Sequence, residues 1–480
     1  MSGWSEGRRK RGEGAGRTPS TVLPYFFLRV VSSNRTILIW TYIGVLVALS
    51  ACSERYEREH RVVRITTWDE PPNTPVGRIV GVLQREFDES FPHIEVQRRP
   101  VGGRATDSRL AFTTAMAGDN APDCYHAAYF PTISLWIEQG FCLPLDDYIR
   151  GDPQFRDVVE AAFAPAEKDG HIYGVPSELY VMALVYRKDL FEEVGLDPRR
   201  PPKNWLEFAE YAMRLTDPER HRYGFAILGQ EWASWHWEIY VWQAGGEVTE
   251  RLPDGRCRVR FTEEPAVRAL QYYKDLRWKY RCIQSNPLQS YQDNRRDFLQ
   301  GRAAMILSSP EWIGDFLNEG LRPEQIGIAP LPAGPTGLRA TQIGGAFYII
   351  NPRSSKAKQD AAWEYIRFMT SKEAQIKRLK MMEEAHLRYP IAFFYRDLRV
   401  EDYLTIPEEW GEASATSLKY GRMEYYLKDR IEPYLARPIQ AVLVDPGADP
   451  REELEKCAER VLREVVEPFN EEIERKLARR

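Results

Sequence analysis

The sequence lacks the short signatures of several large enzyme classes. Its 480 residues contain neither HExxH nor GxxxxGK followed by Ser or Thr, and its seven histidines follow no metal-ligand spacing. It also lacks a basic stretch interleaved with aromatic residues, which would indicate a nucleic-acid partner. We therefore expect a protein that is not an enzyme and has no metal, no cofactor and no nucleic-acid partner.

The chain also has no low-complexity tract and no internal repeat. With 43% hydrophobic and 28% charged residues, its composition is that of a globular protein. Its length is enough for two or three domains with a large core. The net charge of −4 is small, so charge alone indicates no class of partner.

The apolar run near the N-terminus is too short to span a membrane. It covers about 13 mostly apolar residues from Ile37 to Leu49, whereas a spanning helix needs about 20. A basic segment that includes Arg8-Arg9-Lys10-Arg11 precedes it, and the small residues Ser50 and Ala51 follow it. This order is typical of a secretory signal, so we predict that residues 1–51 are a signal peptide.

The end of this segment, Leu49-Ser50-Ala51-Cys52, resembles a bacterial lipobox. The resemblance implies that Cys52 is acylated and becomes the mature N-terminus, which would anchor an extracytoplasmic protein to the cell membrane. An ordinary signal peptide or an N-terminal membrane anchor is the alternative. Residues 53–61 are charged and have no apolar periodicity, so we expect a short tether at 52–61.

Cysteine is scarce, with six in the whole chain. Without Cys52 five remain, so at least one is unpaired, and no spacing matches a zinc site. Cys257 with Cys282 is one possible disulfide; burial of all five as small hydrophobic residues is the alternative. The five are Cys124, Cys142, Cys257, Cys282 and Cys457.

Strands and helices alternate along the chain after residue 61. A β-branched strand is predicted at 62–67, a helix at 77–90, a strand at 94–96, a helix at 107–117 and a short strand near 121–126. Further strands are expected at 184–186, 223–228, 303–307 and 347–350, and helices at 205–215, 264–280, 291–300, 356–370 and 451–477. This alternation predicts α/β architecture, in which ligands bind at the carboxyl ends of the strands.

Several short motifs follow one another along the chain. They are AMAGDNAPD at 115–123, GFCLPLDDY at 140–148, GVP at 174–176, YRKDLF at 186–191, NWLEF at 204–208, GRAAM at 301–305 and GG at 344–345. In these motifs and their order the chain resembles the family 1 extracellular solute-binding proteins of ABC importers, the maltose-binding-protein-like family, over nearly all of its length after the signal.

The resemblance implies the type II periplasmic-binding-protein fold, with two discontinuous α/β lobes, hinge strands and a ligand cleft between the lobes. We expect lobe 1 to comprise 62–176 and 344–388, and lobe 2 to comprise 177–343 and 389–480. The crossings are expected near 175–180, 341–345 and 387–391. Hinge closure on a ligand, a monomeric state and permease subunits of an ABC importer as partners are further implications of the resemblance.

A carbohydrate ligand requires a particular set of side chains. Carboxylates, amides and Arg can bind two neighbouring hydroxyls, and aromatic rings cover the C–H faces of a sugar. Four loops carry such sets, the hinge adds two residues, and a glycine could allow close approach of the backbone. The candidates are Trp68, Asp69, Glu70, His126, Tyr129, Glu178, Tyr180, Glu231, Trp232, Trp235, Glu311, Trp312 and Gly345.

Structural roles compete with binding at several of these positions. Trp68 could instead fill the core of its lobe, and Trp235 belongs to a helix-like stretch with Trp237 and Trp242, of which at least one is expected in the core. Asp146 and Asp147 are expected to stabilise a turn. The competing functions are binding of a non-sugar solute such as a polyamine or peptide, a sensor subunit, and a glycosidase, which would need two suitably spaced carboxylates.

Overall fold

The computed structural model describes residues 62–69, 71–100, 105–126, 132–230, 232–385, 387 and 393–478. Residues from Val62 onward form one compact unit. The predicted signal peptide, Cys52 and the tether lie outside the described residues. Within those residues, no helix is both long and apolar enough to cross a membrane.

Lobe 1 is built on a mixed sheet in the order β14-β13-β3-β1-β2, with β6 paired to β13. β1 is parallel to β2 and β3, whereas β13 is antiparallel to β3 and β6. The strands are β1 (Val63–Asp69), β2 (Ile94–Pro100), β3 (Cys124–Tyr125), β6 (Val175–Val181), β13 (Thr341–Ile350) and β14 (Gly421–Arg422).

Helices cover both faces of this sheet. Tyr348 and Ile350 of β13 pack in one core cluster, and Phe347 and Ile349 pack in another, because alternate strand residues face opposite sides. The lobe also contains α2 (Pro75–Ser90), α3 (Ala105–Ala117), α4 (Thr132–Glu138), α5 (Asp146–Gly151), η1 (Pro153–Asp157), η2 (Glu160–Ala162), η3 (Ala164–Ala166), β4 (Glu167–Lys168), β5 (His171–Ile172), α12 (Lys356–Met369) and α13 (Lys372–Glu384).

Lobe 2 is built on the sheet β12-β7-β11-β8. Its strands are β7 (Ala183–Arg187), β8 (Tyr223–Ala226), β11 (Ala303–Ser308) and β12 (Ile326–Ala329). Its helices and smaller elements are α6 (Lys188–Glu193), α7 (Trp205–Leu215), α8 (Ala233–Gln243), β9 (Thr249–Arg251), β10 (Cys257–Val259), α9 (Glu264–Trp278), α10 (Tyr291–Leu299), η4 (Pro310–Trp312), α11 (Ile313–Asn318), η5 (Pro323–Gln325), α14 (Glu408–Leu418), α15 (Lys428–Val444), α16 (Pro450–Val461), η7 (Leu462–Val466) and α17 (Glu467–Leu477).

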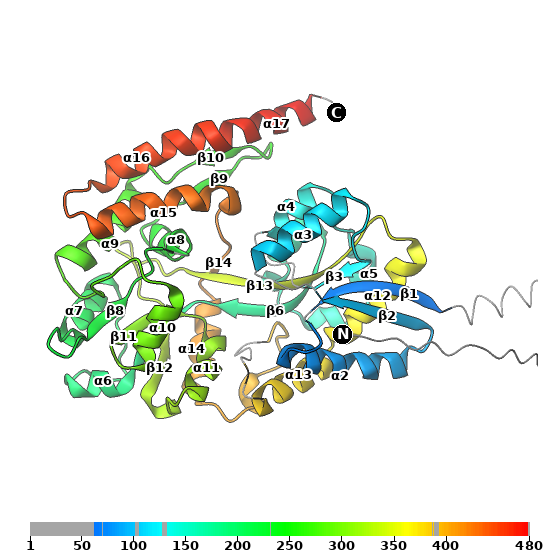
Figure 1. Cartoon of the computed structure of the whole chain (residues 1–480), viewed down its shortest axis with the longest axis horizontal. Coiled ribbons are helices and arrows are strands. Elements are labelled where there is room, and N and C mark those ends of the chain that lie inside the picture. The colour runs from blue at the N-terminus through cyan, green and yellow to red at the C-terminus, as the bar shows by residue number, and fades with distance from the viewer. Residues whose placement is uncertain are drawn as a thin grey trace, which may run out of the picture. The chain divides into compact units, whose positions relative to one another are not determined.

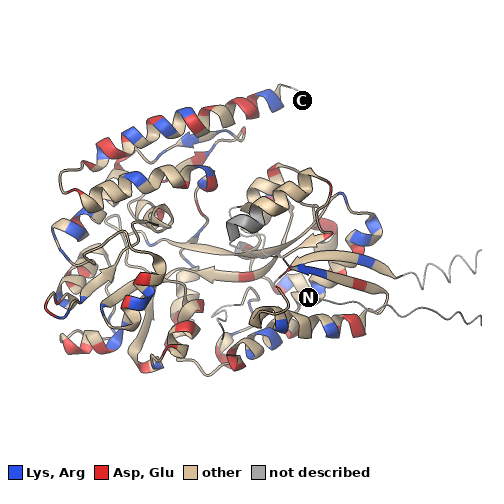
Figure 2. Cartoon of the chain, in the orientation of Figure 1, with Lys and Arg blue, Asp and Glu red and all other residues tan. Residues whose placement is uncertain are grey.

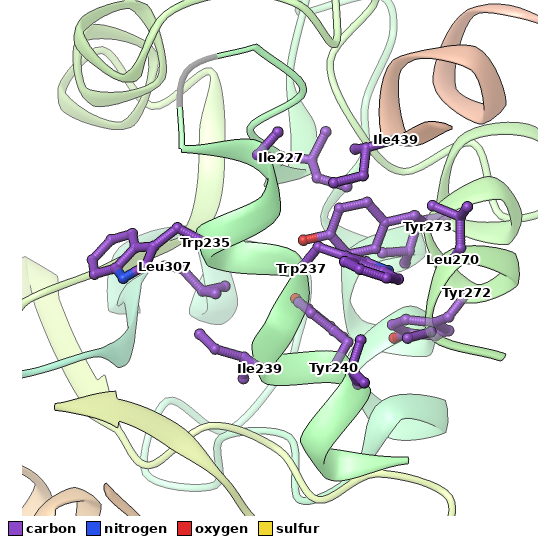
Figure 3. Packing of buried hydrophobic residues seen from close by; sticks show 14 of the residues in the cluster. Ile227, Trp235, Trp237, Ile239, Tyr240, Leu270, Tyr272, Tyr273, Leu307 and Ile439 are labelled. Atoms are coloured by element: carbon purple, nitrogen blue, oxygen red, sulfur yellow. The ribbon is translucent and has the colours of Figure 1, made fainter. Parts of the chain in front are cut away.

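The core of lobe 2 is rich in aromatic residues. Trp237 and Trp242 of α8 are fully buried, and Trp237 lies among Tyr240, Tyr272 and Tyr273 in Figure 3. The tryptophan-rich stretch is therefore mainly core, as expected for part of it. At the periphery, α16 and α17 carry residues of both charges along their length (Figure 2).

Several helices begin where the sequence provides a cap. The side chain of Thr74 accepts a hydrogen bond from the Gly77 amide at the start of α2, and Asn204 does the same for Glu207 at the start of α7. Ser290 and Asp293 form a reciprocal capping box at the start of α10. Asp146 and Asp147 lie in the first turn of α5, consistent with the structural role expected for them.

Two long strands pass between the lobes. Figure 1 shows β6 and β13 running side by side from one sheet to the other, and their antiparallel register shifts between Ala346 and Phe347. The chain passes from one lobe to the other along these strands, and each of them contains one of the first two predicted crossings. Most of the third predicted crossing, 387–391, lies outside the described residues. Phe394 and Tyr395 still pack in the lobe 1 core, and Val400 of η6 (Val400–Asp402) and Leu404 pack with residues of α2 and α13, so we place that passage after Leu404.

The five cysteines that the structure describes are free and buried. Cys257 and Cys282, which the sequence offered as a possible disulfide, are separate thiols within the core of lobe 2. The structure therefore agrees with the alternative, in which the five cysteines are small buried residues.

Candidate functional site

An aromatic cluster in lobe 2 contains two of the predicted residues. The ring centroids of Trp232 and Trp312 are 6.1 Å apart, and Tyr291 lies 5.3 Å from Trp232 and 4.7 Å from Trp312. Trp232 follows β8, and Trp312 ends η4, which follows β11; these two strands are parallel neighbours. Their carboxyl ends therefore bring the two tryptophans together. Trp232 is 38% exposed, so part of its ring surface is accessible to a ligand.

Trp232 has an unusual backbone conformation. Its φ of 57° and ψ of 16° are left-handed, and its carbonyl accepts the hydrogen bond from the His236 amide at the start of α8. A non-glycine residue in this region costs about 1 kcal/mol. Such strain persists where the surroundings fix it, and it is concentrated at functional sites. Here it places the indole beside Trp312 and Tyr291.

Trp235 supports this cluster from the core. Trp235 is only 7% exposed. The centroid of its ring lies 6.1 Å from that of Trp232 and 6.4 Å from that of Tyr180 on β6. The side-chain amide of Gln342 on β13 donates hydrogen bonds to the main-chain oxygen of Trp235 and to Glu238. Trp235 therefore connects the exposed Trp232 to the strands between the lobes, and we assign it to the lobe 2 core.

On lobe 1, Asp69 and His126 meet at the ends of β1 and β3. His126 Nδ1 lies 3.3 Å from Asp69 Oδ1, and Nε2 lies 3.1 Å from Ser177 Oγ. Ser177 in turn donates to the carbonyl of Ala346 on β13, and the imidazole packs on Tyr348 with centroids 4.4 Å apart. Both side chains are buried. His126 thus joins β1, β3, β6 and β13 at the point where the lobes connect.

Glu178 forms the charged part of this region. The Arg378 guanidinium on α13 donates a hydrogen bond to its carboxylate. Burial pushes the pKa of Glu178 upward, but Arg378 and His126 outweigh it and hold the pKa below its usual value. The Glu178 side chain remains 34% exposed and that of Arg378 only 12%, so the carboxylate is ionised, preorganised and partly accessible.

The two glycines of β13 have a packing role. A Cβ on Gly345 would lie 2.0 Å from the Glu178 carbonyl oxygen, and one on Gly344 would lie 2.2 Å from the Tyr180 ring. The hinge partner strand β6 therefore fills the space beside both residues. This close approach of β6 accounts for both glycines, and the expectation that Gly345 lets a ligand approach the backbone stays a prediction.

The remaining predicted residues lie outside the two groups described above or outside the described part of the chain. Trp68 packs on Phe112 and Tyr125, with centroids 6.2 and 6.1 Å away, in the cluster beneath α3 and α4. Its neighbour Asp69 faces the opposite side of β1, because side chains alternate along a strand. Glu311 and Trp312 share η4 and are half-buried. The predicted ligand contacts Glu70, Tyr129 and Glu231 lie outside the described residues.

The sequence predicts a cleft between the lobes, but the residues that line one pocket there were not among the predicted ligand contacts. This pocket has a volume of about 240 Å³ and is lined by residues of α4, by 164–168 and by Arg251 and 423–430. Tyr426 Oη lies 3.1 Å from Glu138 Oε1 across it. The segment GRMEYYLKDR at 421–430 combines aromatic and charged residues before a helix, which is the pattern that identified the other loops and could have identified this one.

Comparisons with known proteins give a consistent result. Residues 75–376 match the family model described as bacterial extracellular solute-binding protein. A protein of Brucella abortus (strain 2308), whose given name specifies binding but no ligand, is 29% identical over 339 residues, covering 70% of this chain and 78% of its own. The maltotriose-binding protein of Pyrococcus abyssi is 23% identical over 314 residues, covering 62% of this chain and 61% of its own.

Solved structures share the architecture. The structure of UgpB from Mycobacterium tuberculosis in complex with glycerophosphocholine has a TM-score of 0.69 at 20% identity and covers 83% of this chain and 98% of its own. The fold is that of the type II periplasmic binding proteins, with two α/β lobes, and the predicted fold class is confirmed.

Proposed function

Because this chain belongs to the bacterial extracellular solute-binding protein family of ABC transporters, we propose that it captures a carbohydrate, in particular an oligosaccharide, and delivers it to the permease subunits of an importer. The observation that carries the choice of ligand is the partly exposed Trp232 beside Trp312 and Tyr291. A flat aromatic surface of this kind matches the C–H face of a sugar ring.

The polar residues near the hinge support the same ligand. The ionised Glu178 carboxylate, held by Arg378, can accept hydrogen bonds from two neighbouring hydroxyls. Asp69 and His126 lie on the adjoining strand ends. Aromatic and polar groups on different lobes give a neutral, hydroxyl-rich ligand the contacts it needs on both sides.

Hinge motion provides the mechanism that we propose. The lobes are linked by β6 and β13, so a small change along these strands would move one lobe relative to the other. A ligand that contacts both lobes binds the closed form more tightly and shifts the population towards it. The importer would then recognise the closed form, and neither step requires catalysis by this chain.

We propose that the protein works outside the cytoplasm as a lipid-anchored monomer. The family is extracellular, and the signal-like residues 1–51 with Cys52 supply the proposed anchor. Mass spectrometry of the protein purified from membranes would test the anchor. A diacylated Cys52 at the mature N-terminus is expected, and an unmodified protein in the soluble fraction would contradict it.

A thermal-unfolding screen of residues 53–480 tests the ligand. A ligand at 100 times its dissociation constant stabilises the native state by roughly 2.7 kcal/mol, which raises the midpoint by a few degrees. We expect the unfolding midpoint to rise with one class of oligosaccharide and not with polyamines or with neutral or basic peptides. At the same ligand concentration Trp232→Ala should about halve the rise in the unfolding midpoint, whereas the control Tyr280→Ala, outside the aromatic cluster, should keep it.

A glycerophosphodiester is the second candidate ligand, because the related fold of Mycobacterium tuberculosis UgpB holds glycerophosphocholine. Tryptophans beside carboxylates also suit a quaternary ammonium group. A rise with glycerophosphocholine and none with sugars would favour this candidate and overturn the carbohydrate.

A further inference from the structure

A basic groove lies on the surface of lobe 2, away from the aromatic cluster. It has a volume of about 420 Å³, and its rim carries Arg199, Arg200, Lys203 and Arg339. Its floor contains the buried Pro202 and the half-buried Pro201 and Pro330, and no acidic residue lines it. Four cations therefore surround one apolar surface.

The charge of the groove is only partly compensated. Arg199 lies 3.5 Å from Asp197, and the Glu207 carboxylate accepts a hydrogen bond from the Lys203 amide at 2.9 Å. Within the described part of the chain, Arg200, Lys203 and Arg339 form no ion pair. The whole chain has a net charge of −4, so this concentration of positive charge is a local feature. Like charges in one groove repel each other, and an anionic partner would relieve that repulsion.

The groove is rigid as well as basic. The Arg339 guanidinium donates to the carbonyl of Leu331 at 2.8 Å and to that of Lys203 at 3.3 Å, and it lies 6.0 Å from the Tyr420 ring centroid. The Ala333 amide donates to the same Lys203 carbonyl at 2.9 Å. The two segments that form the groove are thus joined by main-chain hydrogen bonds, so little backbone conformational entropy would be lost on binding.

We infer that this groove docks an extended, acidic peptide segment of the membrane partner. The inference rests on the proposed delivery to an importer. An extended peptide would contact both the proline-rich floor and the cationic rim, whereas a single phosphate would use only part of the rim. A flat anionic bilayer would contact protruding cations more readily than the floor of a groove. Complementary charge of this kind would speed and orient docking more than it would add affinity.

The test uses a fluorescein-labelled hexaglutamate peptide and fluorescence anisotropy with residues 53–480. We expect binding at low salt that weakens as sodium chloride is added, because the rim charges are exposed. The double variant Arg200→Glu/Lys203→Glu should weaken binding by about tenfold or more. The matched control Arg268→Glu/Lys279→Glu changes the net charge equally at two exposed lobe 2 positions and should bind like the wild type.

Four results would overturn the inference: no binding to the wild type at low salt, equal weakening in both double variants, saturable competition by low concentrations of inorganic phosphate, or preferential binding of phosphatidylglycerol vesicles that the groove variant loses. The carbohydrate screen on the same variants separates this inference from the proposed function. A groove variant that keeps its ligand-induced rise but loses the peptide supports the inference. If no carbohydrate raises the unfolding midpoint of the wild type, that result would instead count against the proposed function.

Discussion

The Tyr426 hydroxyl lies 3.1 Å from the Glu138 carboxylate and joins the segment before α15 in lobe 2 to α4 in lobe 1. Lys168 Nζ and Arg251 Nη2 each lie 3.7 Å from the same oxygen. Glu138 therefore accepts contacts from both lobes, next to the strands that link them. We therefore expect this acidic side chain to contribute to the stability of the unit.

Tyr426→Phe should lower the free energy of unfolding by about 1 kcal/mol, because it removes a hydrogen bond to a charged acceptor while Lys168 and Arg251 keep that acceptor paired. Urea unfolding at neutral pH measures the change. Tyr434→Phe is the control, because Tyr434 makes the same kind of bond to Glu464 on the surface of lobe 2. An equal loss in both variants would show that the contact between the lobes has no special weight.

Glu238→Gln should change how stability depends on pH. Burial first, and then the nearby Glu424, raise the pKa of Glu238, while Lys428 opposes them. An acid with a raised folded pKa lowers stability as pH rises from its unfolded value through its folded value, because the unfolded chain releases the proton first. As pH rises above the ordinary value for a glutamate, the wild type should therefore lose stability relative to the variant. Parallel urea-midpoint profiles for the two proteins would contradict this.

Arg378→Met should destabilise the protein by about 1–2 kcal/mol at neutral pH, less than for a fully buried pair because a third of the Glu178 side chain is exposed. The lowered pKa of Glu178 contributes stability above its unfolded value, and this is lost as pH falls through the folded value. The difference between wild type and variant should therefore shrink in acid. Adding Glu178→Gln should restore part of the loss, and a double variant less stable than Arg378→Met would exclude this pairing.

Trp232→Ala should lower the ligand affinity and Trp410→Ala should lower the stability. Trp232 is 38% exposed and Trp410 is fully buried. Removal of Trp232 should weaken ligand binding by about tenfold while unfolding changes little. Removal of Trp410 should cost about 3–5 kcal/mol of stability and leave the affinity of the folded protein unchanged. Calorimetric titration with the ligand from the thermal screen separates the two, and unchanged affinity in Trp232→Ala would exclude it from the site.

Gly344→Ala should destabilise the protein by about 1–3 kcal/mol, because the added Cβ would overlap the Tyr180 ring. In a Tyr180→Ala background the same change should cost much less, since the conflicting ring is absent. Gly345→Ala serves as the comparison, because its Cβ would meet the Glu178 main chain, which no side-chain change can move. Additive losses for Gly344→Ala and Tyr180→Ala in a double-mutant cycle would refute this explanation.

The sequence was most informative where a local pattern agreed with the tertiary structure. The predicted helix at 205–215 coincides with α7, which has an Asn cap and an apolar stripe. The helix α15 was not predicted, because Pro433 and Pro438 interrupt its pattern. The predicted C-terminal helix at 451–477 is divided by the π-helical turn η7, which apolar spacing does not reveal.

The candidate site was predicted only in part. Aromatic residues beside acidic ones in loops identified Trp232 and Trp312, which the structure brings together. Arg378, Ser177 and Tyr291 were not predicted, because each contributes through contacts with residues distant in the sequence. Trp68 and Asp69 were grouped as neighbours, although strand alternation sends their side chains to opposite faces.

The buried thiols make the two lobes separately observable. Burial raises the pKa of Cys124, Cys257, Cys282 and Cys457 to about 12, so at neutral pH these groups react with alkylating reagents only after the surrounding structure opens. Cys124 and Cys142 belong to the lobe 1 clusters, and Cys257, Cys282 and Cys457 to that of lobe 2. Peptide mapping after timed alkylation would therefore report which lobe unfolds first, with no label introduced into the chain.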